Sequence, residues 1–515
     1  MAAGSKPRGK APAILLLGIL PVITVLGFFA ASCGNADDGG PGPTSQPPEG
    51  ERTPPEGQGA QSEFTPAENA DYGGYTFRIL GYDGAAKGIW QIAEISEIIA
   101  AEESGEPIND AIYRRNREVE ALYNIEFGIV PVTYPNRGDF AAKFTKAVLA
   151  GEDLFDAAFL LGDSLPASLS KNNMCHDLMS IPSLDLSAGW WDQNSIKGMS
   201  IGGKVNAVIG DVNLYSATAP QAIFANKKLM QDNEVGDLYE MVREGKWTWD
   251  AMYDIMKKTT KDINGDGTID KNDQIGLFAQ YVHLHPSILS AGEILTPKDG
   301  GDIPVLAPNT ERVAAIVAKV GPILKDRSAA IIAEDIASGY GNVFFEFILP
   351  KFRDNEIMFH VNQLLFSFEL RNMDADFAIL PFPKFDAAQK DYGAMVAGAW
   401  ATYTVIPITC ADTERTANIL QAMGHYSKTH VTPAYYDVTV TNKLIRDDES
   451  AEMLDLIIGN RVFDLAYLYN WGDINSMINT ISSSGKSDTF VSQFEKNENK
   501  INAAIQKTLD QLQAD

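Results

Sequence analysis

Apolar residues after position 74 follow two alternating periods, that of strands and that of helices. The run Tyr75–Leu80 has the pattern of a strand, and Ile108–Tyr123 repeats its apolar residues near one face of a helix. A second helix, Phe140–Ala150, ends at Gly151, and Leu154–Leu161 is apolar enough for a buried strand. This alternation predicts an α/β lobe with a largely parallel sheet.

The same alternation continues to the end of the chain. We expect further strands at Val205–Ile209, Ala222–Ala225, Phe377–Leu380 and 400–407, and further helices at Asp250–Lys258, Thr310–Leu324, Thr413–Tyr426, Ala451–Gly459 and Lys496–Gln513. No internal repeat is present. A chain of 515 residues exceeds one compact domain, so at least two lobes are expected.

The first 33 residues have the pattern of an export signal. A basic start precedes the apolar run Ala11–Phe29, and small residues then precede Cys33. This arrangement resembles the lipobox of bacterial lipoproteins, in which the cysteine is lipidated after cleavage. The alternative is an uncleaved anchor, because the apolar run is nearly long enough to span a bilayer. In both cases the body lies outside the cytoplasm and is tethered to a membrane, and for a lipoprotein we expect a Gram-positive cell surface.

Composition adds a stalk and an acidic surface. Residues 34–72 are rich in Gly, Pro, Glu and Gln and have few large apolar side chains, so we expect a disordered stalk. The formal charge is −26, and the first 33 residues hold three basic and no acidic side chains, which leaves −29 on the remainder. Such a charge disfavours nucleic acid and anionic lipid as partners.

The four residues 162–165, Gly-Asp-Ser-Leu, spell the signature of a family of serine esterases. An esterase of that type needs a histidine base, usually three residues after an aspartate near the C-terminus. None of the six histidines has an aspartate at that spacing, and none lies beyond residue 430. What remains of the motif is a strand end followed by a short loop and a helix start, a place where open α/β sheets bind ligands.

The segment 262–273, "DINGDGTIDKND", fits the pattern of a calcium-binding loop, with Gly267 at the position of the sharp turn. The expected metal ligands are Asp262, Asn264, Asp266, the carbonyl of Thr268, Asp270 and Asp273. The last position usually holds the longer glutamate. We expect a structural Ca²⁺ that gathers the four carboxylates, and the alternative is a surface turn rich in Asp and Asn.

Aromatic residues cluster at several places near acids and amides. Sugars bind by stacking their C–H faces on aromatic rings, while carboxylates and amides take the hydroxyls. Trp247 and Trp249 flank a helix N-cap at Thr248, so we expect them in the core. Trp471 precedes Gly472, and a cleft and the core are equally consistent with its sequence context.

Histidine and cysteine add little chemistry. The short pair His283 and His285 is expected to be packed or in a loop rather than at a metal site. Cys175 and Cys410 are expected to form either one disulfide or two buried thiols, and the sequence does not choose between them.

Several segments together resemble the extracellular solute-binding proteins of family 1, the sugar receptors of ABC importers. The resemblance covers residues 75–510 and rests on "FDAAFLLGD", "GGKVNAVIGD", "IFANKKLM", "REGKWTWDAMYDIMKK", "DADFAILPFPKFD" and "RVFDLAYLYNWG". It implies a two-lobed α/β fold of the type II periplasmic-binding-protein kind, with a hinge between the lobes. The protein would then be a monomer that binds a carbohydrate and delivers it to the membrane subunits of an ABC permease.

The resemblance also implies a layout. Lobe one would comprise residues 75–203 and 392–435, and lobe two residues 204–388 and 436–515, with crossings near 202–204 and 383–385. The implied ligand-binding residues are Tyr82, Asp83, Asp163, Trp190, Trp191, Asp211, Asn213, Trp400 and Trp471. Asn213 stands where such receptors often carry an acid.

Two alternatives remain open from the sequence. One is a secreted carbohydrate hydrolase that shares the aromatic cleft, since paired carboxylates can be distant in sequence. The other is a surface lipoprotein for adhesion or peptide binding. The sequence contains no phosphate-binding P-loop, no HExxH zinc motif and no CxxC redox motif.

Overall fold

A computed structural model describes residues 63–87, 90–169, 174–308, 310–440 and 448–513. The predicted export signal, Cys33 and the stalk up to residue 62 lie outside the described residues. In the part that is described, no helix has both the length and the apolar composition needed to cross a membrane.

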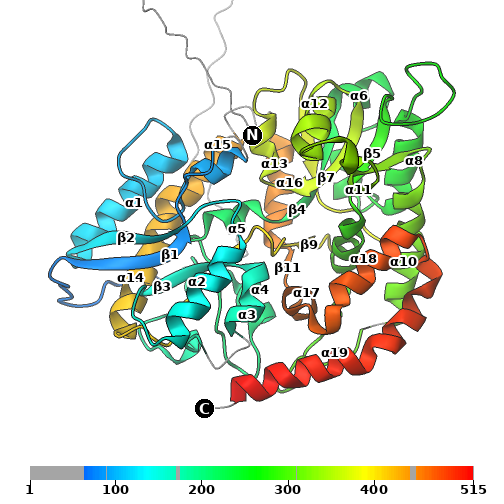
Figure 1. The fold of residues 1–515 in the computed structure, drawn as a ribbon. Helices are drawn as coiled ribbons and strands as arrows, with labels where there is room; N and C mark the ends of the chain where they lie inside the picture. The colour runs from blue at the N-terminus through cyan, green and yellow to red at the C-terminus, as the bar shows by residue number, and fades with distance from the viewer. Residues whose placement is uncertain (1–62, 88–89, 170–173, 309, 441–447, 514–515) are drawn as a thin grey trace, which may run out of the picture. The chain divides into compact units, whose positions relative to one another are not determined.

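The first sheet has four strands in the order β10-β3-β1-β2 (Figure 1). Its strands are β1 (Tyr75–Tyr82), β2 (Ile125–Val132), β3 (Ala157–Leu161) and β10 (Thr402–Val405). β1 runs parallel to both β2 and β3, whereas β10 is antiparallel and pairs Thr402 with Leu161, the last residue of β3. The carboxyl ends of the parallel strands therefore lie next to the start of β10.

The second sheet has five strands in the order β6-β5-β7-β4-β8. Its strands are β4 (Gln221–Asn226), β5 (Ile275–Ala279), β6 (Ala330–Ile332), β7 (Ile357–Gln363) and β8 (Phe377–Leu380). β5 is parallel to β6 and β7, whereas β4 is antiparallel to β7 and pairs Gln221 with Gln363. The carboxyl end of β7 thus lies next to the start of β4.

Helices cover both faces of each sheet (Figure 1). The first lobe has α1 (Pro107–Tyr123), α2 (Gly138–Leu149), α3 (Leu165–Leu169), α4 (Gln193–Met199), α5 (Leu214–Thr218), α14 (Thr413–Tyr426) and α15 (Thr432–Val440). The second lobe has α6 (Lys227–Asp232), α7 (Leu238–Arg243), α8 (Trp249–Thr259), α9 (Leu284–Ser290), α10 (Thr310–Lys325), α11 (Ala333–Ile336), α12 (Leu349–Arg353), α13 (Phe366–Leu370), α16 (Asp448–Gly459), α17 (Leu465–Tyr469), α18 (Ile474–Ser484) and α19 (Phe490–Gln513).

Alternate residues of the strands face opposite cores. In β1, Phe77 and Ile79 belong to a core with residues of α1 and α14, whereas Leu80 and Tyr82 face the core that contains α2. In the second sheet one face packs against α8 and α10, and the other against α12 and α16. Because side chains alternate between two covered faces, every residue of β3, β4, β5, β6, β8 and β10 is buried.

Among the described residues, two short segments that join the lobes run side by side. Ala397 donates its backbone N–H to the carbonyl of Ala219 at 3.1 Å, and Val396 forms a β-bridge with Pro220. The first segment leads into β4, and the second leads back into β10. β4 and β10 each begin at the carboxyl edge of their own sheet. The carboxyl edges of both sheets therefore lie next to the two crossing segments.

The crossings differ in position from the expected ones. Residues 204–214 were assigned to the second lobe, but Val205, Val208 and Val212 pack in the core of the first sheet. Lys384, expected at a crossing, instead bridges with Thr248 inside the second lobe. Gly202 and Gly203 lie in a turn that the bridge of Ile201 with Lys204 closes within the first lobe. The hinge lies about fifteen residues later in the chain than expected at each of the two places.

The predicted stalk also ends earlier than residue 72. The ring of Phe64 stacks on His425 with centroids 4.7 Å apart, and the backbone N–H of Tyr72 donates to the carbonyl of Tyr123 at 2.9 Å. Phe64 and Tyr72 thus attach the end of this polar segment to the first lobe.

Most predicted helices match the structure, and six strands were missed. β2, β5, β6 and β7 were not expected, nor were the two-residue strands Ala394–Met395 and Arg461–Val462. The predicted strand Val205–Ile209 is an extended segment that forms a single bridge, Val208 to Thr404. Trp247 and Trp249 are buried and Thr248 caps α8, as predicted.

Candidate functional site

A groove lies at the carboxyl edge of the first sheet, where β3 ends and α2 begins. Its volume is about 570 Å³, and it is open to solvent. The lining residues come from the turn before α2, the first turns of α2 and the end of β3: Pro135, Asn136, Arg137, Gly138, Asp139, Ala141, Asp163 and Ser164. Of the residues predicted to bind ligand, Asp163 lies here.

The backbone of Asp163 is hydrogen-bonded to the hinge, and its side chain forms an ion pair with Arg137. Its backbone N–H donates to the carbonyl of Gly398 in the second crossing segment at 3.0 Å. Its carboxylate lies 3.4 Å from the guanidinium of Arg137, and both side chains are about two-fifths exposed. Partial burial raises the pKa of Asp163, while Arg137 opposes that rise. The groove therefore offers a carboxylate and a guanidinium side by side, with acceptors and donors both facing solvent.

Arg137 also touches the hinge. Its Nη1 donates to the carbonyl of Ala399 at 3.2 Å. Ser164, the nucleophile that an esterase would need, is buried with its hydroxyl 3.5 Å from the Asp163 carboxylate.

Tyr82 and Trp400 belong to an aromatic cluster beneath this groove. The ring of Tyr82 lies 5.9 Å from Tyr134, 5.2 Å from Tyr215 and 6.4 Å from Trp400. Both Tyr82 and Trp400 are buried, and the indole N–H of Trp400 donates to Thr218 at 2.6 Å. The predicted aromatic residues therefore support the floor of the site and fix the crossing segments, rather than lining the open groove.

Asp83, the neighbour of Tyr82, is engaged within its own loop. Its carboxylate accepts hydrogen bonds from the hydroxyl of Thr133 and from the backbone N–H of Ala85. It lies half-buried at the same sheet edge as Tyr82.

Trp471 does not line the groove with Asp163, in contrast to the prediction. Its ring is buried and stacks on Tyr469 with centroids 5.0 Å apart, and its indole N–H donates to Thr508 of α19 at 2.9 Å. Gly472 has φ of 61°, and a Cβ there would lie 2.9 Å from the backbone nitrogen of Ile501. Trp471 and Gly472, whose sequence context is consistent with a cleft, thus pack against α19, and Gly472 allows α19 to come close.

The second-lobe aromatic residue that does reach this edge is Tyr467. Its hydroxyl accepts the backbone N–H of Gly398 at 3.3 Å, and the carbonyl of Gly398 in turn accepts the N–H of Asp163. Burial raises the pKa of Tyr467 and keeps its hydroxyl protonated at neutral pH. Sequence reasoning passed over Tyr467 because the more prominent Trp471 lies four residues away.

A second contact between the lobes involves Trp90 and Gln91, in the loop after β1. The ring of Trp90 packs against Phe344 and Phe345 of the second lobe, with centroids 4.4 and 5.2 Å away. The backbone N–H of Gln91 donates to the carboxylate of Glu369 at 2.7 Å. No local sequence signal marks these residues, because their contacts join positions more than 250 residues apart.

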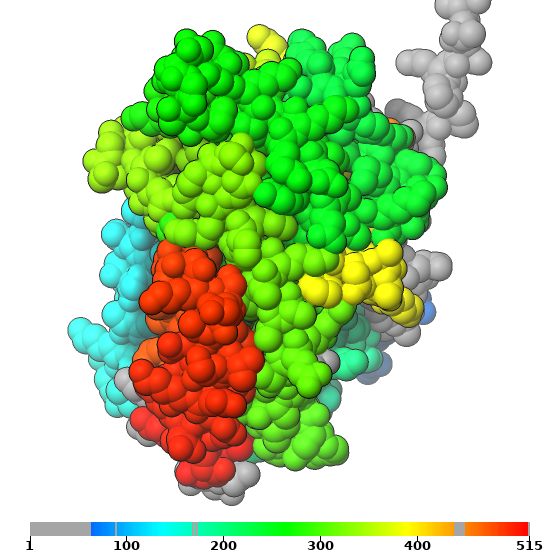
Figure 2. All heavy atoms as spheres, turned by 90° about the vertical axis from the view of Figure 1, so that its right-hand side faces the viewer, coloured from blue at the N-terminus to red at the C-terminus, as the bar shows by residue number. Residues whose placement is uncertain are grey.

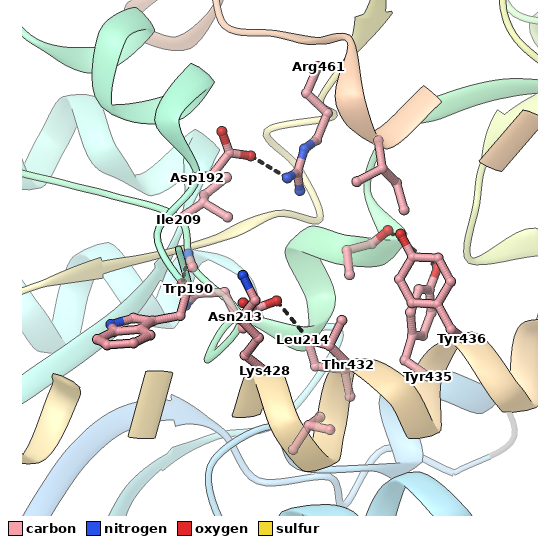
Figure 3. Close-up of a pocket in the computed structure, with 15 residues that line it drawn as sticks. Trp190, Asp192, Ile209, Asn213, Leu214, Lys428, Thr432, Tyr435, Tyr436 and Arg461 are labelled. Carbon is pink, nitrogen blue, oxygen red and sulfur yellow. Dashed lines mark hydrogen bonds and ion pairs between the residues drawn. The ribbon is translucent and has the colours of Figure 1, made fainter. Parts of the chain in front are cut away.

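Trp190, Asp211 and Asn213 come together in a separate pocket beside the hinge (Figure 3). Its volume is about 60 Å³, far less than that of the groove. Burial raises the pKa of Asp211 to about 6. The neighbouring Trp191 is fully buried in the first lobe, and its indole N–H donates to Gln421 at 2.8 Å.

The calcium-like loop has its carboxylates turned to its own backbone. Asp262 accepts the N–H groups of Gly265 and Gly267 at 2.6 and 2.8 Å, and Asp273 accepts those of Ile263 and Asp270. Among the described residues, no group of three or more His, Cys, Asp or Glu side chains is placed to hold a metal ion. The ligand types fit Ca²⁺, but their arrangement would have to change to coordinate it.

The remaining candidate groups are buried in the protein core. Nδ1 of His283 accepts the backbone N–H of Gln280, and burial lowers the pKa of both His283 and His285 to about 3. Cys175 and Cys410 are both free and buried, which resolves the choice left open by the sequence.

Comparison with known proteins finds similarity in structure. No protein-family model matches the sequence, and no curated protein matches it significantly. The GacH receptor of Streptomyces glaucescens, solved without ligand and with acarbose, superposes with a TM-score of 0.51 at 13% identity, over 85% of this chain and 99% of that one. UgpB of Mycobacterium tuberculosis, solved with glycerophosphocholine, gives 0.54 at 15% identity, over 78% and 98%.

A third solved structure has the same fold. The ABC substrate-binding protein Lmo0181 of Listeria monocytogenes, in complex with cycloalternan, gives a TM-score of 0.51 at 12% identity, over 84% of this chain and 98% of that one. These identities are too low to carry over a ligand, but the coverage includes both lobes. The chain therefore has the two-lobed α/β fold of ABC transporter substrate-binding proteins.

Proposed function

We propose that this protein is the extracytoplasmic substrate-binding component of an ABC transporter and captures a carbohydrate between its lobes. The observation that carries the proposal is the position of the Asp163–Arg137 groove at the sheet edge that adjoins both crossing segments. Its volume of about 570 Å³ lies within the range of small-molecule sites. Two structural neighbours, GacH and Lmo0181, were solved in complex with acarbose and cycloalternan.

The groove chemistry favours an uncharged ligand rich in hydroxyl groups. Asp163 and Arg137 neutralise one another, so neither calls for a charged partner. A sugar hydroxyl both donates and accepts, and it can therefore bridge the carboxylate and the guanidinium. The hydroxyl of Tyr467 would contribute a further contact from the second lobe.

Capture would proceed by a hinge equilibrium. A ligand that touches both lobes favours the closed form by its differential affinity for that form. The contacts of Trp90 with Phe344 and of Gln91 with Glu369 already join the lobes, and they would close the entrance over a bound ligand. We propose binding without bond cleavage, and the fold shared with substrate-binding proteins supports this proposal.

The sequence supplies the remaining parts of the proposal. Lipidation at Cys33 would tether a monomer to the outer face of the cytoplasmic membrane of a Gram-positive cell, and the closed form would be presented to permease subunits. The segment 262–273 would bind a structural Ca²⁺ through side chains that turn away from the loop backbone.

Asp163→Asn tests the ligand site directly. A panel of neutral oligosaccharides should raise the melting temperature of the wild-type protein, and the variant should lose at least tenfold in affinity because one strong acceptor is weakened. Asp232→Asn is a matched control, since Asp232 also lies in an ion pair and its side chain is equally exposed, at 42%. Equal affinity of both variants would remove the Asp163 groove as the binding site.

A further inference from the structure

The hinge pocket is built from three parts of the chain that belong to different lobes (Figure 3). Asp192, Asp211 and Asn213 come from the segment that packs on the first sheet, and Thr432 comes from α15. Arg461 comes from the short strand β11 (Arg461–Val462), which pairs with β9 (Ala394–Met395) directly before the second crossing segment. A rotation of the lobes would therefore move Arg461 relative to the other polar groups.

A buried ion pair connects the two sides of this pocket. The guanidinium of Arg461 contacts the carboxylate of Asp192, and the two side chains are only 7% and 4% exposed. The other carboxylate oxygen of Asp192 accepts the backbone N–H of Ser195 and caps α4. The pair thus links a helix end of the first lobe to a strand beside the hinge.

Other polar atoms at the pocket have no protein partner among the described residues. They are Oδ2 of Asp211, Nδ2 of Asn213 and Nε of Arg461. Asn213 and Arg461 are more than nine-tenths buried, so bulk water does not reach them readily. Buried polar groups without partners are costly, and native proteins supply those partners.

The size of the pocket limits what can supply them. A volume of about 60 Å³ accommodates a few water molecules, but it is too small for a sugar ring with its hydroxyl groups. The polar atoms without a protein partner include both hydrogen-bond acceptors and donors, and a water molecule can pair with either kind.

We propose that this pocket binds a small cluster of ordered water that bridges Asp211 and Asn213 to Arg461. Together with the Asp192–Arg461 pair, the cluster forms a hydrated lock that restrains the angle between the lobes. Arg461 is then a positioning residue, which acts on the ligand groove only through the hinge. The proposal does not depend on the identity of the ligand.

The angle between the lobes can be measured on the ligand-free protein. Spin labels at Lys146→Cys in α2 and Lys257→Cys in α8, in a Cys33→Ser background, report the distance between the lobes, since Cys175 and Cys410 are buried. We expect one narrow distance distribution for this protein and a distribution at least twice as wide for Arg461→Met. Arg243→Met is the control, because it removes an exposed ion pair with Glu452 within the second lobe.

A milder substitution at Arg461 separates the effect on the hinge from an effect of unfolding. Arg461→Lys keeps the charge but lacks Nε and the planar fork, so it should broaden the distribution to an intermediate degree. A crystal structure of the unsubstituted protein should show water within hydrogen-bond distance of Asp211, Asn213 and Arg461. Unchanged widths in both Arg461 variants, or density for no solvent or for a larger solute in the pocket, would overturn the proposal.

Discussion

Glu97 connects the loop after β1 to both crossing segments. It is fully buried, and its carboxylate accepts the backbone N–H of Tyr215 at 3.1 Å and the hydroxyl of Thr402 at 3.0 Å. Tyr215 lies in α5 before the first crossing, and Thr402 begins β10 after the second. Burial raises the pKa of Glu97 to about 8, against the attraction of Arg115.

The raised pKa of Glu97 predicts a pH dependence of stability. The folded state holds a proton that the unfolded state has lost between about pH 4.5 and pH 8, so the free energy of unfolding falls as pH rises through that window. The full shift corresponds to at most about 5 kcal/mol. Glu97→Gln should flatten this slope between pH 5.5 and 8.5 in urea unfolding.

The control for Glu97 is Glu103→Gln, which removes an exposed carboxyl group from the same loop. It should unfold with the pH dependence of the unsubstituted protein. An equal slope in Glu97→Gln and Glu103→Gln would show that Glu97 does not carry the effect.

Among helices, α19 carries Thr508, which accepts the indole N–H of Trp471. The same helix, red in Figure 2, runs along the second lobe beside α10. The carbonyl of Ser483, at the end of α18, accepts the ammonium group of Lys325 at the end of α10 at 2.9 Å. These contacts explain why the C-terminal helices belong to the second lobe. The contact with α19 also explains why Trp471, which precedes Gly472, is buried.

Gly472→Ala tests this close approach. A Cβ at residue 472 would lie 2.7 to 2.9 Å from Ile501, so α19 would have to shift. Gly485→Ala is a matched control, because Gly485 also has positive φ but its nearest neighbour is a flexible lysine stem at 3.4 Å. We expect Gly472→Ala to lower the free energy of unfolding by about 2 kcal/mol more than Gly485→Ala. An equal decrease in the free energy of unfolding for both variants would mean that α19 shifts without an energetic penalty.

The loop 262–273 gives a prediction at the same scale. If Ca²⁺ gathers its carboxylates, a chelator should lower the melting temperature by a few degrees and added Ca²⁺ should restore it. Mg²⁺ should restore less, because it requires shorter, octahedral coordination. Melting that responds to neither chelator nor Ca²⁺ would leave the loop as a surface turn held by its own hydrogen bonds.

The sequence predicted elements well where periodicity is strong and poorly where it is interrupted. α1, α2, α8, α10 and α14 have clear apolar faces and were expected close to their observed bounds. β2 contains Gly128 and Pro131, which obscure a strand, although Pro131 is exposed at its end. β7 is buried on both faces and lacks alternation, so its pattern does not separate strand from helix.

The candidate site was only partly predictable, for a physical reason. A residue at a strand end, such as Asp163, can be placed from local pattern because strand ends gather at one edge of a sheet. The hinge position, Tyr467 and the contact of Trp90 with Phe344 depend on packing between distant segments. Trp471 shows the converse, since its sequence context fitted a cleft and its packing is with α19.

At the scale of the whole molecule, two groups of contacts act on one hinge. Trp90 and Gln91 join the lobes near the groove, and Arg461 and Asp192 join them at the hinge pocket. Under the proposed function, a ligand in the groove would gain contacts with the second lobe only in the closed form. Converting a population that is 99% open to one that is 99% closed requires about 10⁴-fold tighter binding to the closed form.

Small-angle X-ray scattering, with and without the oligosaccharide that raises the melting temperature most, tests the central claim most directly. We predict that the radius of gyration decreases on binding and that mass spectrometry recovers the oligosaccharide intact. Saturating ligand that leaves the radius of gyration unchanged, or an oligosaccharide recovered as shorter fragments, would contradict capture by closure of the two lobes.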